Sequence, residues 1–392
     1  MIEQHEIEQL RAEWSLESGV IEKDYVLGWL LAGIAQHDAL SRTWIFKGGT
    51  CLRKCYYETY RFSEDLDFTV TAGGPEDSSE LIHIFKEIVE WMRTNSGLEL
   101  VIDQSSFRVR QNRRGKSTTQ GRIGYRGPNP PPVLPKIKID VTSDELIVES
   151  PVLRTIGHSY SDAPLPVSGV LCYSPSDLLA EKVRALAERC RPRDLYDVIH
   201  MYRHPDLVGR ARDVLTSLSK KCEYVGIETP TIESVESSPF RSEIELEWVN
   251  MLGHQLPKPL PGFDQFWGGL DDLFAWLSGD LEIPLLQRAS RNDLDEKWEP
   301  PKAIASWRAG FPIELIRYAG ANRLKVEIDY RAEQGRSGPR IVEPYSLRRT
   351  SDGNILLFVI NDHGQLRGYR IDRIAGVNVT PLVFTPKYLV EF

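Results

Sequence analysis

The chain has 392 residues, of which 41% are apolar and 27% charged, so it is long enough for two or three domains with ordinary globular cores. A net charge of −8 argues against a protein that binds nucleic acid over its whole surface, and any such surface must be local. No Cys-x-x-Cys pair occurs, so the spacing suggests neither a disulfide framework nor a zinc site. The five cysteines are Cys51, Cys55, Cys172, Cys190 and Cys222.

Neither a targeting segment nor a membrane span is indicated. The N-terminus, MIEQHEIEQL, is polar and acidic, unlike a signal peptide. The longest apolar stretch, YVLGWLLAGIA, is too short to cross a bilayer, so we expect no membrane partner. A reducing cytoplasm fits these features and the cysteine pattern best.

Apolar periodicity predicts mixed helices and strands in the first half of the chain, and a loop-rich segment with short helices over 226–300. A linker is expected at 300–312, followed from residue 322 by short strands typical of a separate all-β domain. The elements expected in the first half are a helix over 5–38, a strand at 43–46, a helix from 50, a strand at 66–70, a helix over 78–95, a β-hairpin or meander over 99–142, a helix over 176–190 and a helix from 192.

The first candidate site is the Asp-x-Asp of Asp65 and Asp67. On a strand both carboxylates point the same way and repel each other unless a cation holds them. Carboxylate oxygens suit Mg²⁺ or Mn²⁺. The Gly48-Gly49 pair upstream lets the backbone approach a phosphate closely, and together these features indicate a metal-dependent phosphoryl-transfer site rather than an acidic surface strand.

Such a site needs a third carboxylate on a neighbouring strand, and the stretch PKIKIDVT supplies Asp140. Ile137 and Ile139 alternate with Lys138 and Asp140, so Asp140 is expected to face the same cleft as the Asp-x-Asp. The alternative is a solvated strand face.

Lys182 lies at the edge of the apolar stripe of its helix, where a lysine either extends to solvent or meets an anion such as a nucleoside triphosphate. Ser174 is the expected N-cap of this helix. On the next helix Asp194 and Asp197 share a face. Asp197 is expected either to act on an attacking hydroxyl or to pair with Lys182.

These motifs, in this order, resemble the AbiEii/AbiGii-type nucleotidyltransferase toxins of the DNA polymerase β-like superfamily. The matching stretches within residues 15–225 are "IEKDYVLGWLL", "FKGGTCLRK", "RFSEDLDF", "KIKIDV", "LLAEKVRAL" and "RPRDLYDV". The resemblance implies an α+β fold: a polymerase β-like core over 1–225, a helical lobe and linker over 226–310, and a small C-terminal domain over 311–392. It also implies an enzyme that transfers NMP from an NTP to the 3′ end of RNA, with transfer RNA the expected acceptor, as a toxin opposed by a separately encoded antitoxin.

The same resemblance implies roles for individual residues. Asp65, Asp67, Lys182 and Asp197 would be catalytic, and Asp140 is a weaker match for the third metal ligand. The residues implied to bind the nucleotide are Lys47, Gly48, Gly49, Thr50, Ser63 and Lys182.

A basic stretch runs from Gln104 to Ile139, where Lys and Arg occur without Asp or Glu. Because phosphate contacts supply much of the affinity for nucleic acid, we expect this stretch to guide RNA to the metals, with Phe107 and Tyr125 stacking on bases. A solvated basic hairpin is the alternative. The residues expected to contact RNA are Arg108, Arg110, Arg113, Arg114, Lys116, Arg122 and Arg126.

The tail over residues 322–377 resembles a WYL domain, a small Sm/SH3-like β-barrel associated with bacterial defence regulators. Ile355 and Leu356 replace the aromatic pair that names the family, whereas the arginines are kept. The tail is therefore expected to bind a nucleic-acid or nucleotide ligand by charge, and a barrel used only for packing or dimerisation is the alternative. The residues implied are Tyr330, Arg340, Arg367, Arg370 and Arg373.

Two other functions stay open from the sequence alone. The acceptor could be a protein hydroxyl, although the basic stretch argues against this. The chain could instead be a regulator that senses nucleotides with little turnover, although the intact Asp65, Asp67 and Lys182 argue against a dead enzyme.

Overall fold

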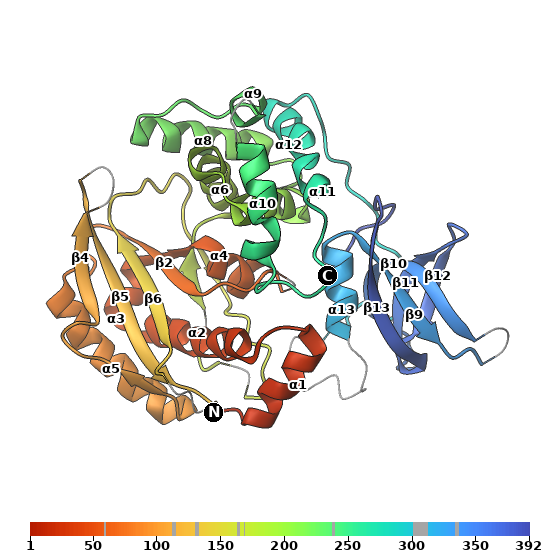
Figure 1. Cartoon of the computed structure of the whole chain (residues 1–392), viewed down its shortest axis with the longest axis horizontal. Helices are drawn as coiled ribbons and strands as arrows, with labels where there is room; N and C mark the ends of the chain where they lie inside the picture. Colours follow the sequence, from red (N-terminus) through yellow and green to blue (C-terminus); the bar gives the residue numbers. More distant parts are fainter. Residues whose placement is uncertain are drawn as a thin grey trace.

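The computed structural model shows a mixed α+β protein with a large sheet, a helical lobe and a C-terminal antiparallel sheet side by side (Figure 1). The expected linker lies almost wholly outside the described residues, which begin again at Ile313. The structure describes residues 1–58, 60–111, 115–129, 133–162, 165–167, 169–236, 240–300, 313–333 and 337–392.

The helices alternate with the strands up to residue 202 and then dominate the chain as far as residue 278. Their bounds are α1 (Gln4–Trp14), α2 (Ser18–Gln36), α3 (Asp38–Thr43), α4 (Gly48–Cys51), η1 (a π-helical turn, Leu52–Tyr56), α5 (Ser78–Ser96), α6 (Pro175–Arg189), α7 (Pro192–Tyr202), η2 (Pro205–Leu207), α8 (Ala211–Val225), α9 (Ile232–Glu236), α10 (Phe240–Leu252), α11 (Phe263–Trp267), α12 (Gly269–Ser278), α13 (Ile313–Ala321) and η4 (Ile371–Arg373).

The strands form two sheets. Those of the large sheet are β1 (Trp44–Lys47), β2 (Asp65–Val70), β3 (Glu99–Val101), β4 (Phe107–Gln111), β5 (Ser117–Arg126), β6 (Lys136–Thr142), β7 (Val152–Arg154) and β8 (Val170–Cys172). Those of the C-terminal sheet are β9 (Leu324–Tyr330), β10 (Gly338–Arg349), β11 (Ile355–Asn361), β12 (Leu366–Arg370) and β13 (Ile374–Val383).

Local signals explain some helix ends. Ser174 caps α6 as expected, since its Oγ accepts a hydrogen bond from the Asp177 amide at 3.1 Å. The single helix expected over 5–38 is wrong in one respect, because Ser15 adopts a left-handed conformation (φ 53°) and separates α1 from α2. None of the helices described is long and apolar enough to span a bilayer.

The large sheet has the strand order β3-β5-β6-β2-β1-β8-β7, and β4 pairs with β5. Strand β2 runs parallel to β6 and β1 parallel to β8, whereas the other recorded neighbours are antiparallel. Helix α5 covers one face, where Phe85 packs on Phe107 with ring centroids 4.8 Å apart. Ile139 of β6 points to this face and is fully buried, so its neighbours Lys138 and Asp140 point to the opposite face.

The C-terminal sheet has the order β12-β11-β10-β9-β13, with antiparallel pairing throughout. Strands occur from Leu324 onward, as expected for the tail, and residues such as Ile328 and Leu357 are fully buried in its core. Among the described residues β12 and β13 are not paired, so the structure shows an antiparallel sheet rather than a hydrogen-bonded closed barrel.

Helix α13 joins this sheet to the rest of the molecule (Figure 1). The buried Arg317 pairs with Glu58 at 2.5 Å, and the Tyr196 hydroxyl of α7 bonds to Asn322 at 3.0 Å. The C-terminal sheet is thus tied to the helix that carries Asp197.

Candidate active site

Five neighbouring strands place one polar residue each in a single row, on the face of the large sheet opposite α5. The register pairs Lys47 with Asp67, Asp67 with Asp140, Asp140 with Gln120, and Gln120 with Arg108. Directly opposite residues on adjacent strands share a face. With neighbouring strands about 4.8 Å apart, the row is about 19 Å long and leads from Lys47 past two carboxylates to an arginine.

A cavity of about 440 Å³ lies over the Asp67 end of this row. The sheet supplies its floor, and α6 supplies the opposite wall with Glu181, Lys182 and Arg184. The structure therefore brings together Lys47, Gly48, Asp67, Asp140 and Lys182, which lie far apart in the sequence.

Neighbouring side chains come so close to residues 48 and 49 that only glycine fits at either position without a shift. Gly48 has a φ of 80°, and a Cβ at this position would lie only 2.3 Å from Asp67 Oδ2. A Cβ on Gly49 would lie 2.7 Å from Arg61 Nη2 and 3.0 Å from Ser63 Oγ. The pair thus makes room for the second aspartate and for Arg61.

Thr50 and Ser63 lie beside this turn. The buried Thr50 hydroxyl donates to the Asp65 carbonyl oxygen at 2.5 Å, so it ties the turn to β2 in this structure. Ser63 lies against Gly49, and neither hydroxyl lines the 440 Å³ cavity.

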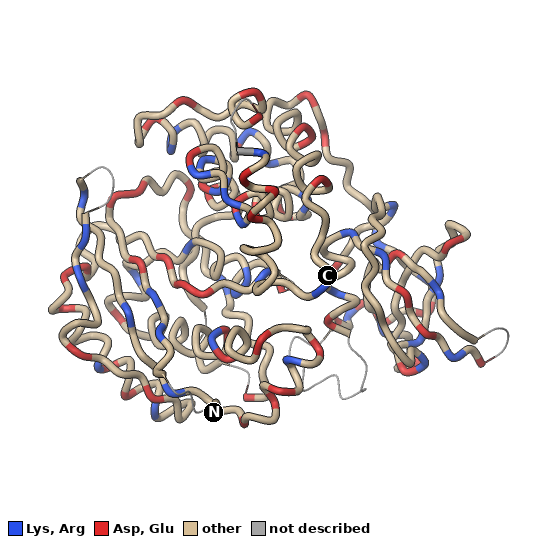
Figure 2. The backbone as a smooth tube through the Cα atoms, viewed as in Figure 1, with Lys and Arg blue, Asp and Glu red and all other residues tan. Residues whose placement is uncertain are grey.

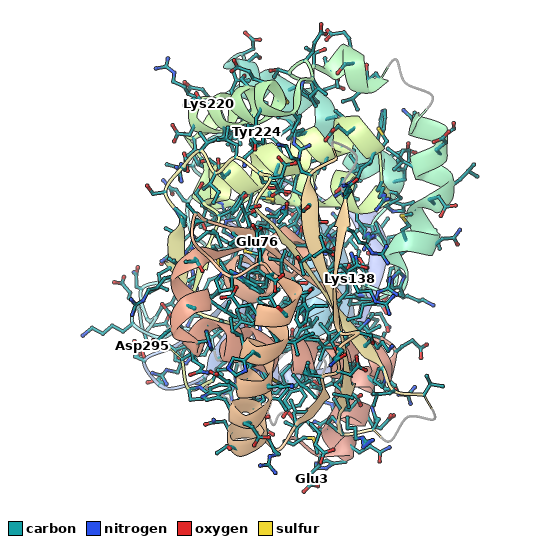
Figure 3. The ribbon with its side chains drawn as sticks, turned by 90° about the vertical axis from the view of Figure 1, so that its left-hand side faces the viewer. Glu3, Glu76, Lys138, Lys220, Tyr224 and Asp295 are labelled. Carbon is teal, nitrogen blue, oxygen red and sulfur yellow. The ribbon has the colours of Figure 1, made fainter. Side chains whose placement is uncertain are left out.

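The two aspartates of β2, Asp65 and Asp67, have surroundings that disfavour their negative charge. Burial raises the pKa of Asp67 to about 6, with repulsion from Asp140 and Asp65 adding to the rise and Lys47 opposing it. Burial also raises the pKa of Asp65. Asp140 is held by Lys138 and by Gln120, whose amide donates at 3.0 Å. Figure 3 labels Lys138 on the side of the strands away from α5.

This donor set fits a divalent cation. The carboxylates of Asp65, Asp67 and Asp140 lie on one face of two adjacent strands, and neighbouring anions disfavour their charged forms until a cation joins them. Hard oxygen donors are those that Mg²⁺ or Mn²⁺ takes.

The sequence interpretation missed two acidic residues beside Lys47. The Nζ of Lys47 forms ion pairs with Glu145 and, at 3.0 Å, with Glu181. Burial alone would lower the pKa of Lys47, but these two carboxylates raise it well above its ordinary value. Only the fold could reveal this cluster, since no spacing rule links residues 47, 145 and 181.

Lys182 meets an anion of its own chain. Its Nζ lies 2.7 Å from Asp197 Oδ2, which is the pairing that the sequence left as one of two alternatives. Asp197 is fully buried and also accepts from Arg61 Nε at 2.6 Å and Nη2 at 2.7 Å, and from the Tyr60 hydroxyl at 2.5 Å. Although burial opposes its charge, Arg61 and Lys182 hold the pKa of Asp197 far below its usual range.

The basic stretch forms the other end of the row (Figure 2). Arg108, Arg110, Arg122 and Lys136 line a second hollow of about 240 Å³ on the same face, together with Gln120, which touches Asp140. Arg126 lies further along β5, 3.8 Å from Glu99, and Lys116 precedes the strand. Arg113 and Arg114 lie outside the described residues.

The expectation that Phe107 and Tyr125 stack on bases is wrong. Phe107 and Tyr125 are each 2% exposed and point into the core beneath the sheet. They alternate with the basic residues along β4 and β5, so the same period that exposes the arginines buries the rings.

In the C-terminal sheet the expected ligand-binding arginines have local partners. The Arg340 guanidinium lies 5.3 Å from the Tyr330 ring centroid and donates to the Tyr369 hydroxyl at 3.1 Å. The other three arginines bond to nearby acceptors: Arg367 to Gln365 at 2.6 Å, Arg370 to Asp372 at 2.6 Å and Arg373 to Glu333 at 2.8 Å.

Comparisons with known proteins show which solved structures and which families this chain is similar to. The solved structure of MenT4, a nucleotidyltransferase toxin from Mycobacterium tuberculosis H37Rv, is 20% identical, with 71% of this chain and 88% of that chain covered and a TM-score of 0.45. Proteasome accessory factor B/C of Arthrobacter aurescens is 11% identical, covering 94% of this chain and 72% of that one, with a TM-score of 0.19. Both scores are below 0.5, so the assignment rests on the family models.

None of the curated proteins matches the sequence. Residues 313–379 match the WYL domain. Residues 29–269, more than half of the chain, match the family described as nucleotidyl transferase AbiEii toxin of type IV toxin–antitoxin systems. This chain is therefore a nucleotidyltransferase that belongs to the AbiEii toxin family.

Proposed function

We propose that the chain transfers a nucleotidyl group from a nucleoside triphosphate to the 3′ hydroxyl of an RNA, with transfer RNA the expected acceptor. The observation that carries this proposal is the row of paired residues from Lys47 to Arg108, because it joins a carboxylate site to a basic face on one surface. In the reaction a bond forms between the RNA oxygen and the α-phosphorus, pyrophosphate leaves, and the hydroxyl proton passes to solvent.

Asp65, Asp67 and Asp140 are the residues that would hold Mg²⁺ or Mn²⁺. When bound, such a cation neutralises the triphosphate and lowers the pKa of the attacking hydroxyl. Gly48 lines the cavity, where its backbone would face a phosphate and its missing Cβ leaves room for Asp67, and Gly49, Thr50 and Ser63 support that turn.

Lys47 and Lys182 supply positive charge at the cavity. Since Asp197 has its oxygens occupied by Arg61, Tyr60 and Lys182, its proposed role is to position Lys182 rather than to take the hydroxyl proton. The carboxylates Glu145 and Glu181 hold Lys47 against the wall of the cavity in the same way.

The basic face favours RNA over a protein as the acceptor. Arg108, Arg110 and Arg122 line one hollow, and Arg126 with Lys116 extends it along β5. Phosphates along a strand of RNA match such a linear set of cations, whereas a protein hydroxyl needs none.

For the remaining parts of the chain the proposal is coarser. The WYL domain would close into a barrel and bind a nucleic-acid or nucleotide ligand through Tyr330, Arg340 and the arginines of β12 and η4. The enzyme would work in the cytoplasm as a toxin, opposed by a separately encoded antitoxin. Domain limits of 1–225, 226–310 and 311–392 complete this picture.

The test is direct. The purified full chain is incubated with Mg²⁺, each α-labelled nucleoside triphosphate in turn, and total transfer RNA, beside the Asp65→Ala/Asp67→Ala variant. We expect label on RNA that is lost in the variant and falls steeply as salt rises. Label on protein alone would refute the RNA acceptor. Bound nucleotide without any transfer would point to a sensor instead.

A further inference from the structure

Three of the five cysteines meet behind the nucleotide turn, although the sequence separates them. The sulfur atoms of Cys51, Cys55 and Cys172 all lie within 4.8 Å of one another. Cys51 ends α4, Cys55 follows four residues later on η1, and Cys172 comes from β8. The other two cysteines, Cys190 and Cys222, are not part of this group.

The geometry matches a metal better than a disulfide. A disulfide needs two sulfur atoms and leaves the third unused, whereas here all three converge on one point from two sides. In a tetrahedral site with Zn–S bonds of about 2.3 Å, sulfur atoms lie about 3.8 Å apart. Since the three sulfur atoms lie no more than 4.8 Å apart, each pair needs to move closer by no more than about 1 Å to bind one zinc ion.

The site is closed on one side and open on the other. Cys51 and Cys172 are fully buried, whereas Cys55 is partly exposed and forms part of the wall of a hollow of about 200 Å³. Three protein ligands with one position facing a hollow is an arrangement that zinc sites adopt, with water or a small ligand as the fourth donor.

Nearby positive charge favours one thiolate in the cluster, at Cys55, whereas burial raises the pKa of Cys51 and of Cys172 well above the usual range of a thiol. Burial alone would raise the pKa of the Cys55 thiol, but hydrogen bonds from Cys172 and Cys51 and the positive charges of Lys54 and Arg154 lower it to about 5. No Asp or Glu belongs to the group among the residues described, so the donor set is entirely sulfur. Soft thiolates select zinc over the hard cations that suit the Asp65–Asp67 site.

We propose that Cys51, Cys55 and Cys172 bind one thiophilic divalent cation, zinc in the cell, at a second metal site distinct from the carboxylate site. Binding releases the protons of the thiols that were protonated. The proposal does not depend on the acceptor or on the carboxylate metal.

The position of this site suggests what the cation would do. Cys172 pairs with Phe46 of β1, and the Cys51 thiol donates to the Phe46 carbonyl oxygen at 3.5 Å. Lys47 and Gly48 follow directly. A cation here would hold η1 to β8 and so fix the start of the nucleotide turn from behind.

The first test measures metal content. The full chain is purified under reducing conditions, supplied with Zn²⁺ and dialysed against a weak chelator, then assayed by elemental analysis. We expect one zinc per chain in the wild type and in the control Cys222→Ser, whose buried thiol is outside the cluster. The Cys55→Ser variant should bind at least about 100-fold more weakly, since even outer-shell changes cost 10–100-fold. Wild type without zinc, or Cys55→Ser with undiminished affinity, would overturn the proposal.

Two further readouts do not depend on the variant folding. Co²⁺ added to the wild type should produce the absorption of sulfur-to-cobalt charge transfer, and Zn²⁺ should slow alkylation of Cys55 as followed by peptide mass. Co²⁺ without that absorption, or alkylation at the same rate with and without Zn²⁺, would count against the site. A disulfide between any two of the three cysteines in freshly purified protein would also refute it and indicate redox chemistry.

Discussion

Replacing Gly48 by alanine probes the contact between the nucleotide turn and the second aspartate. The new Cβ would lie 2.3 Å from Asp67 Oδ2, 3.1 Å from Cγ and 3.2 Å from Cβ of the same residue. Because an ordinary contact begins near 3.4 Å, the carboxylate or the turn must move by about 1 Å. The whole Asp67 side chain is close, so rotation of its tip alone cannot relieve the clash.

Two effects follow and can be separated. The left-handed φ of 80° costs an alanine about 1–3 kcal/mol of folding free energy. The displacement of a carboxylate by about 1 Å should lower kcat/KM for nucleotidyl transfer by about 100-fold. The matched control is Gly73→Ala, since Gly73 has a φ of 82° and a Cβ added there would have nothing within 4 Å.

The assay follows transfer of label from an α-labelled nucleoside triphosphate to RNA, with urea unfolding measured on the same samples. We expect similar losses of stability in the two variants but a loss of activity in Gly48→Ala alone. Equal activity of the two variants would refute the reasoning that Gly48 is needed to leave room for Asp67.

The other predictions concern folding, pH and RNA. Arg61→Ala leaves the buried carboxylate of Asp197 without its bidentate partner and should lower the free energy of unfolding by about 3–5 kcal/mol, as measured in urea. Burial lowers the pKa of His200 to about 3, so its neutral form stabilises the fold above pH 6.5 and this contribution is lost as pH falls from 6.5 toward 3. His200→Phe should therefore lose less stability than the wild type over that range. Arg108→Ala and Arg122→Ala should each weaken RNA binding and reduce the slope of log affinity against log salt by about 1, while the KM for the nucleotide stays unchanged.

Each of these has a control of the same residue type on the surface. Arg93→Ala breaks an exposed pair with Glu90 and should change stability little. His83→Phe alters a histidine whose side chain is 80% exposed, so its pH profile of stability should follow the wild type. Arg212→Ala removes an exposed charge from α8 and should leave the salt slope as it is. Equal effects in a variant and its control would contradict the corresponding argument.

Local patterns in the sequence were sufficient to predict most helices and strands and part of the candidate site. Period-two alternation placed Asp65, Asp67 and Asp140 on one face of their strands, since side-chain direction in a strand depends only on parity. Short strands were predicted from residue 322 onward because apolar residues alternate there between turn residues, and the structure has β9 to β13 in this stretch. The N-cap Ser174 was predicted for a similar local reason.

Parity also explains the main error. The sequence shows that Arg108 and Phe107 point to opposite faces, but not which face is covered by a helix. The packing of α5 on the sheet decided that the rings are buried and the arginines exposed.

Only the tertiary structure decided which distant segments of the chain are in contact. Strand order and register set the row from Lys47 to Arg108, and the packing of α7 on the loop after η1 set the contacts of Arg61 with Asp197. The convergence of Cys51, Cys55 and Cys172 belongs to the same class, and their spacing had argued against a zinc site. Periodicity acts over a few residues, whereas these contacts depend on how whole elements pack, which no local spacing encodes.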